Sequence, residues 1–226
     1  AKVVAIRPEG DGQIGPSVDI EYTLAARDGE SERLTYDYLI NATGPKLNFG
    51  ATEGLGPDGH SVSVCTASHA KQAADALAAT VERLRAGEQQ TLVVGMGHGT
   101  CTCEGAAFEY VTNVEQHLRK AGVRDRARVV FLTNEHELGD FGVDGMLFKD
   151  RGMETTSDLW AGSLFRERGI EPILGAHVEK VEDGAVHYEL LDGSHHSLQA
   201  GFMMLLPPFR GQEIKVYGRD GADITE

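Results

Sequence analysis

Basic residues are scarce in this sequence. Its 21 lysines and arginines are outnumbered by 35 aspartates and glutamates, which gives a formal net charge of −14 and a pI near 5.0. An acidic surface repels phosphate backbones, which argues against nucleic-acid binding. Long apolar runs are also missing, since no stretch approaches the roughly 18 residues of a membrane-spanning helix. From the sequence we expect no signal peptide at its start. The 226 residues suffice for one large domain or two small ones with a hydrophobic core.

Cysteine is rare as well, with only Cys65, Cys101 and Cys103. An odd number excludes a complete disulfide framework, so free or redox-active thiols are the better interpretation.

Hydrophobic periodicity divides the chain into two kinds of region. Strand patterns separated by glycine-rich turns predict an antiparallel meander at residues 3–6, 18–24 and 34–40. Further on, amphipathic patterns predict helices at about 68–86, 104–121 and 157–168. Apolar runs predict strands at 91–95, 128–133, 170–174, 178–182, 185–191 and 202–206. Strand, helix, strand with a glycine-rich first turn indicates the βαβ unit of a Rossmann-like α/β domain.

The turn after the strand at 91–95 begins like a dinucleotide fingerprint. Glycines there let backbone amides approach a pyrophosphate at a helix start. The third glycine position holds Thr100, however, and the loop runs several residues too long. A tight turn with no ligand is an equal alternative. Glu135 is the nearby candidate for the acid that would bind a ribose.

Cys103 immediately precedes the helix predicted at 104–121. The positive end of the helix dipole favours a thiolate there, and a thiolate is a nucleophile. The alternative is that Cys101 and Cys103 are small buried core residues. Zinc bound by Cys101, Cys103 and His98 is disfavoured, because the spacing is tighter than in structural zinc motifs.

Cys65 lies four residues before His69, so the imidazole could tune this thiol or carry its protons. A surface histidine beside an inert thiol fits the spacing equally well. Nothing local makes Glu109 catalytic.

Several segments together resemble the sulfide:quinone oxidoreductases, in order and rough spacing over essentially the whole chain. The Ala42-Thr43-Gly44 element is shared by all flavoproteins with two dinucleotide-binding domains. The Cys-x-x-x-His-Ala segment from Cys65 and the Met-Met-x-x-Pro-x-Phe-x-Gly segment from Met203 are far more discriminating. The remaining segments are Cys103 with Phe108-Glu109-Tyr110, and Leu138-Gly139-Asp140-Phe141-Gly142.

The resemblance implies an FAD-dependent enzyme of the pyridine nucleotide-disulfide oxidoreductase group that oxidises sulfide and reduces a quinone. Cys103 would carry sulfide-derived sulfur as a persulfide beside the flavin. Cys65, His69 and Glu109 would assist sulfur or proton handling. Some members have a histidine at the position of Asp140, and Cys101 has no counterpart. The residues implied to lie at FAD are Ala1, Lys2, Thr43, Gly44 and Pro45.

The resemblance also implies a domain division. Residues 1–47 would be strands of the first FAD-domain segment, 48–60 a linker, 61–206 a degenerate NAD-type domain that has given up NADH, and 207–226 a return toward the FAD domain. We expect the FAD fingerprint upstream of this chain, and a partner redox cysteine, quinone pocket and membrane-docking helices downstream. The chain alone would then be soluble, inactive and without FAD, whereas the parent would lie peripherally on a membrane and could form a homo-oligomer.

Three other functions stay open at this point. The parent could be the flavoprotein subunit of a sulfide dehydrogenase that passes electrons to a cytochrome. It could be a type II NADH dehydrogenase, which an intact nicotinamide loop would favour. It could also be a redox-inert nucleotide-binding or interaction module, in which the three thiols would be unreactive.

Overall fold

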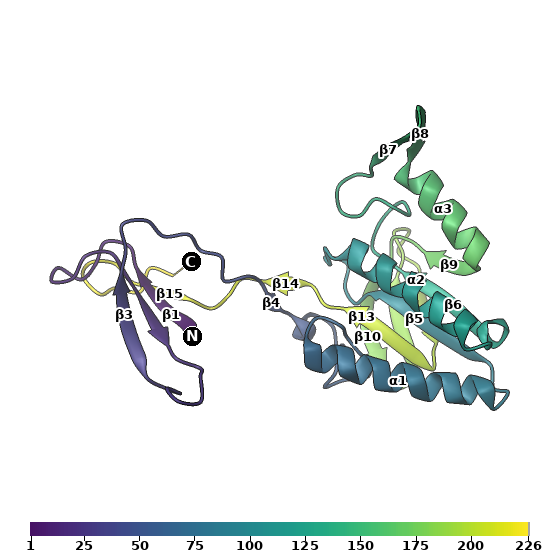
Figure 1. Ribbon diagram of the computed structural model, residues 1–226, viewed down its shortest axis with the longest axis horizontal. Helices are drawn as coiled ribbons and strands as arrows, with labels where there is room; N and C mark the ends of the chain where they lie inside the picture. The colour runs from purple at the N-terminus through teal and green to yellow at the C-terminus, as the bar shows by residue number, and fades with distance from the viewer. Residues whose placement is uncertain (226) are drawn as a thin grey trace. The chain divides into compact units, whose positions relative to one another are not determined.

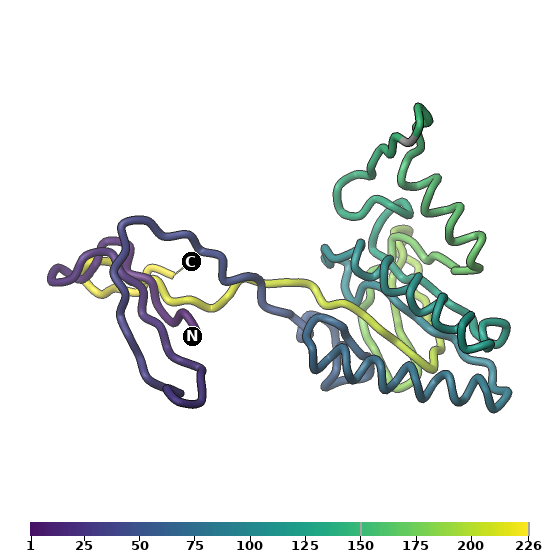
Figure 2. The backbone as a smooth tube through the Cα atoms, in the orientation of Figure 1, coloured from purple at the N-terminus to yellow at the C-terminus, as the bar shows by residue number. Residues whose placement is uncertain are grey.

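The computed structural model describes residues 1–225 and divides them into two compact units. Unit one contains Ala1–Lys46 together with the residues from Arg210 onward, and unit two is Leu47–Phe209. The chain therefore begins in unit one, passes through unit two and returns, as the colour gradient of Figure 2 shows.

Unit one is built on a small sheet in the order β15-β1-β2-β3. Its strands are β1 (Lys2–Arg7), β2 (Ser17–Glu21), β3 (Ser31–Thr35) and β15 (Lys215–Val216). The pairs β1–β2 and β2–β3 are antiparallel, which confirms the predicted meander, and β15 adds in parallel to β1.

The third strand of that meander is shorter than predicted. It ends at Thr35, whereas the apolar pattern had suggested residues 34–40. Tyr38 and Ile40 are 93% and 88% exposed, so no described residue covers the apolar face that the pattern implied. A strand pattern becomes a strand only where a neighbour supplies hydrogen bonds and an apolar surface.

Unit two is centred on a parallel sheet in the order β13-β5-β6-β9 (Figure 1). Its strands are β5 (Gln90–Met96), β6 (Ala127–Leu132), β9 (Ile170–Ile173) and β13 (Phe202–Leu206). All three pairings are parallel. Every residue of β13 is buried, as expected of a parallel strand that is covered on both faces.

Three helices cover one face of the parallel sheet. They are α1 (Ala67–Arg85), α2 (Glu104–Lys120) and α3 (Ser157–Arg168), and each lies within about one residue of its predicted bounds. Their apolar stripes pack with alternate sheet residues in one core cluster. Thr66 caps α1 by accepting the His69 N–H at 3.2 Å, and Gly122 follows α2 with φ +71°.

An antiparallel meander covers the opposite face. It consists of β10 (His177–Glu182), β11 (Ala185–Glu189) and β12 (His195–Gln199), and its inner side chains form a second core cluster with the parallel sheet. Strand β12 and the exposed hairpin of β7 (Leu147–Asp150) and β8 (Met153–Thr156) were not predicted. None of these short sequences has the apolar alternation of a half-buried strand.

Short elements complete the chain. The strands β4 (Lys46–Leu47) and β14 (Phe209–Arg210) pair with each other, and η1 (Phe49–Ala51) and η2 (Arg124–Arg126) are 3-10 turns. Residues 48–60 pack within unit two, where Thr52 and Leu55 are buried and the Thr52 hydroxyl donates to the Gly97 carbonyl at 2.6 Å. The predicted α/β fold class, a Rossmann-like parallel sheet with a small antiparallel meander, is confirmed. In residues 1–225 no helix has the length and apolar character needed to cross a membrane.

A buried carboxylate ties α2 to α3. Glu115 is completely buried and forms ion pairs with Arg119, Arg124 and Arg168. The last two pairs measure 3.1 Å each. Arg124 also donates to the carbonyls of Arg168 and Gly169, so one cluster holds the ends of both helices.

We expect Glu115→Gln to lower the free energy of unfolding by about 3 kcal/mol, because removal of one partner leaves the arginine charges of a buried network uncompensated. Urea unfolding followed by the fluorescence of Trp160, which lies in α3, would measure this loss. The matched control is Glu82→Gln, which breaks an exposed helix pair with Arg85 and should change the free energy by less than about 0.5 kcal/mol. Equal losses in both variants would contradict the assigned role of Glu115.

Candidate functional site: the thiols at the start of α2

Cys103 is the residue that caps the start of α2. It is half-buried, and its side chain makes no capping hydrogen bond to the helix. The seven-residue loop from Gly97 to Cys103 connects it to the end of β5. This places the thiol at the carboxyl edge of the parallel sheet, where ligands of open α/β sheets bind. The predicted position of Cys103 directly before a helix is confirmed.

Two glycines of this loop are required by close packing. A Cβ on Gly97 would lie 2.4 Å from Leu55, and a Cβ on Gly99 would lie 2.3 Å from His177. Either distance is shorter than any real carbon contact, so neither position can hold a larger residue without a shift. The glycines therefore serve protein packing here.

The amides of this loop are directed at protein acceptors. Gly97 N–H donates to the Leu206 carbonyl at 2.8 Å, and Gly99 N–H donates to His177 Nδ1 at 2.9 Å. Thr100 N–H donates to His98 Nδ1 at 3.1 Å, and Cys101 N–H donates to the His98 carbonyl at 3.2 Å. A pyrophosphate held by this loop would have to replace these bonds. The loop thus keeps the outline of a dinucleotide turn but has few free donors.

Side chains from neighbouring strands hold the loop from outside. Asn134, just after β6, donates its amide to the carbonyls of Gly99 and Cys101 at 3.2 and 3.1 Å. The rings of His98 and His177 meet edge to face with centroids 4.7 Å apart. Burial, with a smaller effect of His177, lowers the pKa of His98, which favours the neutral ring that accepts the Thr100 amide. No local pattern could predict the role of His177, because it lies 78 residues from Gly99.

Glu135, the candidate for a ribose-binding acid, is turned inward. It is 4% exposed, and its carboxylate accepts hydrogen bonds from the Thr133 hydroxyl at 2.9 Å and the Phe141 amide at 2.6 Å. Burial raises the pKa of this carboxyl. Glu135 therefore braces the loop after β6 and offers no oxygen to a nucleotide.

Cys65 lies close enough to Cys103 for its charge to act on that thiol, and it is exposed. Its backbone N–H donates to the Ser63 hydroxyl at 3.3 Å. The structure therefore brings together two of the four side chains predicted to be catalytic. Their juxtaposition could not be derived from a separation of 38 positions in the sequence.

His69 and Glu109 are not joined to either thiol by a hydrogen bond or ion pair within residues 1–225. The His69 ring packs edge-on against Phe49, and its Nδ1 is buried without a hydrogen-bond partner among the described residues. Glu109 is exposed on the second turn of α2. Their assignment to sulfur or proton handling stays a prediction.

Cys101 is a structural residue. It is 2% exposed, and its thiol donates to the Leu206 carbonyl at 3.1 Å. Burial raises the pKa of Cys101 to about 12. At neutral pH it is therefore a protonated hydrogen-bond donor that joins the loop to β13.

The expectation that the helix start makes Cys103 a ready thiolate needs correction. Burial, followed by the charges of Cys65 and Glu104, raises the pKa of Cys103. Desolvation and like charge both disfavour the thiolate here, opposite to the effect expected of the helix start. Glu104 is itself 4% exposed, and its Oε2 has no hydrogen-bond partner among the described residues. The effect of Glu104 on the Cys103 thiol was not predicted from the sequence.

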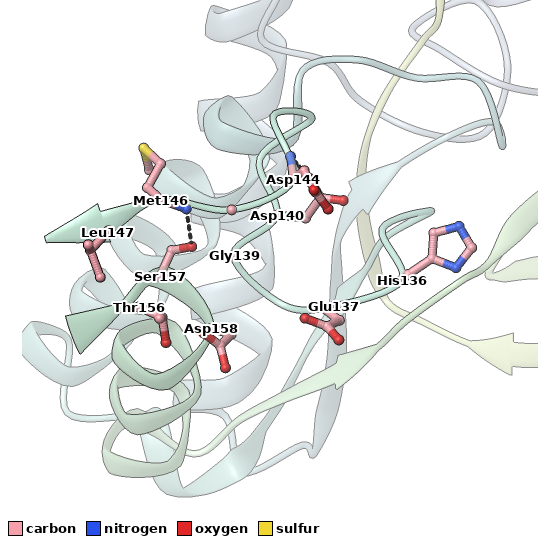
Figure 3. A pocket seen from close by; sticks show the side chains of 11 residues that line it. His136, Glu137, Gly139, Asp140, Asp144, Met146, Leu147, Thr156, Ser157 and Asp158 are labelled. Atoms are coloured by element: carbon pink, nitrogen blue, oxygen red, sulfur yellow. Dashed lines mark hydrogen bonds between the residues drawn. The ribbon is translucent and has the colours of Figure 1, made fainter. Parts of the chain in front are cut away.

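A cavity of about 570 Å³ is lined by the loop after β6 and by the start of α3 (Figure 3). Asp140 lines it together with Glu137, Asp144 and Asp158, so the cavity is acidic. The Asp140 carboxylate accepts the Asp144 N–H at 2.8 Å, and Ser157 accepts the Met146 N–H at 2.8 Å. None of the three cysteines lines this cavity.

The residues expected to contact FAD lie in unit one. Ala1, Lys2 and Thr43 line a shallow cavity of about 320 Å³, and Thr43 and Gly44 line a second one of about 480 Å³. The carbonyl of Pro45 accepts a hydrogen bond from the Gln212 side chain at 3.0 Å, and Gln212 lines both cavities. Gly44 has φ +73°, a conformation that favours glycine. The assignment of these residues to FAD stays a prediction.

We predict that alkylation will label Cys65 and Cys103 in the native chain but not Cys101. Glu104→Gln removes a negative charge that raises the pKa of Cys103, so this thiol should react about threefold faster at pH 7.5. Mass spectrometry of peptides after timed labelling would measure the rates. The control is Glu109→Gln, which removes an exposed carboxylate from the same helix and should leave the rate unchanged. An equal acceleration in the control would refute the assigned effect of Glu104.

Comparisons with known proteins place these features in context. No family model matches the chain. The sulfide-quinone reductase of Aquifex aeolicus (strain VF5) is 36% identical over 192 residues, which are 85% of this chain and 40% of that protein. The X-ray structure of the sulfide:quinone oxidoreductase from Aquifex aeolicus matches 94% of this chain and 43% of its own, with 33% identity and a TM-score of 0.72.

A more distant structure shares the fold. NDH2 from Plasmodium falciparum matches 88% of this chain and 39% of its own, with 15% identity and a TM-score of 0.56. The chain thus spans less than half the length of the relatives that it matches. In sequence and fold, the chain is thus similar to part of a sulfide:quinone oxidoreductase.

Proposed function

We propose that the protein to which this chain belongs oxidises sulfide to polysulfide or sulfur through Cys103 and passes the electrons through FAD to a quinone. The observation that carries the proposal is the 36% identity to a sulfide-quinone reductase over 85% of the chain. The half-buried thiol at the start of α2, with Cys65 close by, supplies a nucleophile of the type that this reaction needs.

The proposed step at Cys103 is the formation of a sulfur–sulfur bond. The thiolate of Cys103 and hydrosulfide form a persulfide, and this oxidation releases two electrons and one proton. FAD, when bound, supplies the two-electron acceptor that the protein side chains lack. Cys65 is proposed as a second sulfur carrier, and His69 and Glu109 as groups that move protons during sulfur transfer.

The proposal assigns FAD contacts to Ala1, Lys2, Thr43, Gly44 and Pro45. Support comes from the shallow cavities that four of these residues line and from the exposed positions that all five occupy. The exposed Tyr38 and Ile40 in the same unit also suit a surface covered in the longer protein. The absence of FAD from the 226-residue chain by itself stays a prediction, as do a peripheral membrane location and a homo-oligomeric state of the longer protein.

Three alternatives were open from the sequence. A flavoprotein subunit of a sulfide dehydrogenase would use the same thiols with a cytochrome as acceptor, and no described residue separates it from the leading proposal. A type II NADH dehydrogenase is disfavoured by the loop amides at Gly97 and Gly99, which are bound to protein acceptors. A redox-inert module is disfavoured by the access to Cys65 and Cys103.

We expect Cys103→Ser in the full-length protein to lower sulfide-dependent quinone reduction by at least about a hundredfold, because a serine hydroxyl cannot form a persulfide. Absorbance of the reduced quinone would measure the rate, and the flavin spectrum would show that the variant is folded. The matched control is Cys101→Ser, whose hydroxyl can keep the bond to the Leu206 carbonyl and should preserve most of the activity. Wild-type activity of Cys103→Ser would refute the proposal.

We also expect NADH to leave the flavin of the full-length protein oxidised, whereas sulfide reduces it. The reason is that the loop after β5 directs its amides at His98, His177 and Leu206. Anaerobic titration with each reductant, followed by the flavin absorbance, would test this. Rapid bleaching by NADH would contradict the interpretation of the loop and favour the NADH dehydrogenase alternative.

A further inference from the structure

The antiparallel meander of unit two carries three metal-ligating side chains on neighbouring strands. They are Glu179 on β10, Glu189 on β11 and His195 on β12. One oxygen or nitrogen atom from each lies within 4.8 Å of the other two. His195 Nδ1 and Glu179 Oε2 are 2.9 Å apart. No cysteine lies on these strands, and the site is separate from the thiols.

Strand register fixes this juxtaposition. His195 is paired directly with Glu189 across β11 and β12. The register between β10 and β11 shifts between Val178 and Lys180, so Glu179 is the extra residue of a bulge. A bulge redirects a side chain, and here it accompanies the approach of Glu179 to Glu189 on the next strand and His195 on the strand after it. Side chains on paired strands are held more rigidly than side chains on loops.

The cluster holds two carboxylates and one imidazole, so a protonated imidazole would balance at most one of the two negative charges. The Glu189 side chain makes no hydrogen bond or ion pair within residues 1–225, and the Glu179 side chain has only His195 as a partner there. The nearby lysine, Lys180, is paired with Glu53 and Glu182 at 3.3 and 2.7 Å. Two carboxylates held together repel each other unless a cation or a proton lies between them. A divalent cation would balance both.

We propose that Glu179, Glu189 and His195 bind a divalent transition metal of the Zn²⁺ type, with solvent completing the coordination. One imidazole and two carboxylates form a mixed nitrogen and oxygen donor set that suits Zn²⁺, Co²⁺ or Ni²⁺, whereas Mg²⁺ and Ca²⁺ prefer oxygen ligands alone. Three protein ligands leave an open coordination position, as in zinc sites that retain water. The exposed His195 side chain, at 64%, leaves the site open to metal from solvent.

The test is titration of the 226-residue chain with Co²⁺ and with Zn²⁺ after Cys65 and Cys103 have been blocked with iodoacetamide, so that the accessible thiols cannot compete. Visible absorption of bound Co²⁺ and isothermal titration with Zn²⁺ should each give one equivalent. We expect His195→Ala and Glu189→Gln each to weaken binding by roughly tenfold or more.

The matched control is His196→Ala, on the same strand. His196 stacks on Tyr188 with ring centroids 5.5 Å apart and is not part of the cluster. This variant should bind both metals with wild-type affinity. The proposal is overturned if His195→Ala or Glu189→Gln binds as tightly as the wild type, or if His196→Ala weakens binding as much as they do. Circular dichroism of each variant would confirm that the strands are intact.

Discussion

The loop between β5 and α2 must satisfy its own backbone groups, and this constraint determines much of what surrounds the thiols. In a dinucleotide-binding domain a pyrophosphate would accept hydrogen bonds from the amides of this turn. Here His177 accepts from Gly99, and Asn134 donates to the carbonyls of Gly99 and Cys101. Buried amides without partners would destabilise the loop, so these side chains replace the ligand. The position of Cys103 at the end of the loop follows from these bonds.

The same packing gives the three thiols different exposure and different chemical properties. Cys101 is enclosed and donates to a β13 carbonyl, which makes it part of the scaffold. Cys103, two residues later, is half-buried and near both Cys65 and Glu104, and its pKa is raised by burial first and by these charges second. A thiol in this environment gives up its proton less readily than a free cysteine. Reactivity would therefore depend on the burial of Cys103 and on the charges around it.

Sequence patterns predicted most of unit two because its elements satisfy local rules. Thr66 caps α1, Gly122 ends α2, and the apolar runs at β5, β6 and β13 are long enough to be recognised. Residues 36–40 have a strand pattern but form no strand, because no described segment pairs with them. Strand β12 was missed because its sequence, His195-His196-Ser197-Leu198-Gln199, is almost wholly polar. It exists because β11 supplies a ladder of hydrogen bonds.

The candidate site shows the same limit more sharply. Cys103 could be found from the sequence, since a cysteine before a helix is a local feature. Its neighbours could not be found in this way. Cys65, which acts on Cys103, lies 38 positions before it in the sequence, and His177, which holds the loop, lies 74 positions after it. Long-range contacts of this kind arise from the order of strands in the sheet, which local patterns do not encode. The thiol can thus be identified from the local sequence. The residues that change its pKa and hold its loop can be identified only once the topology of the fold is known.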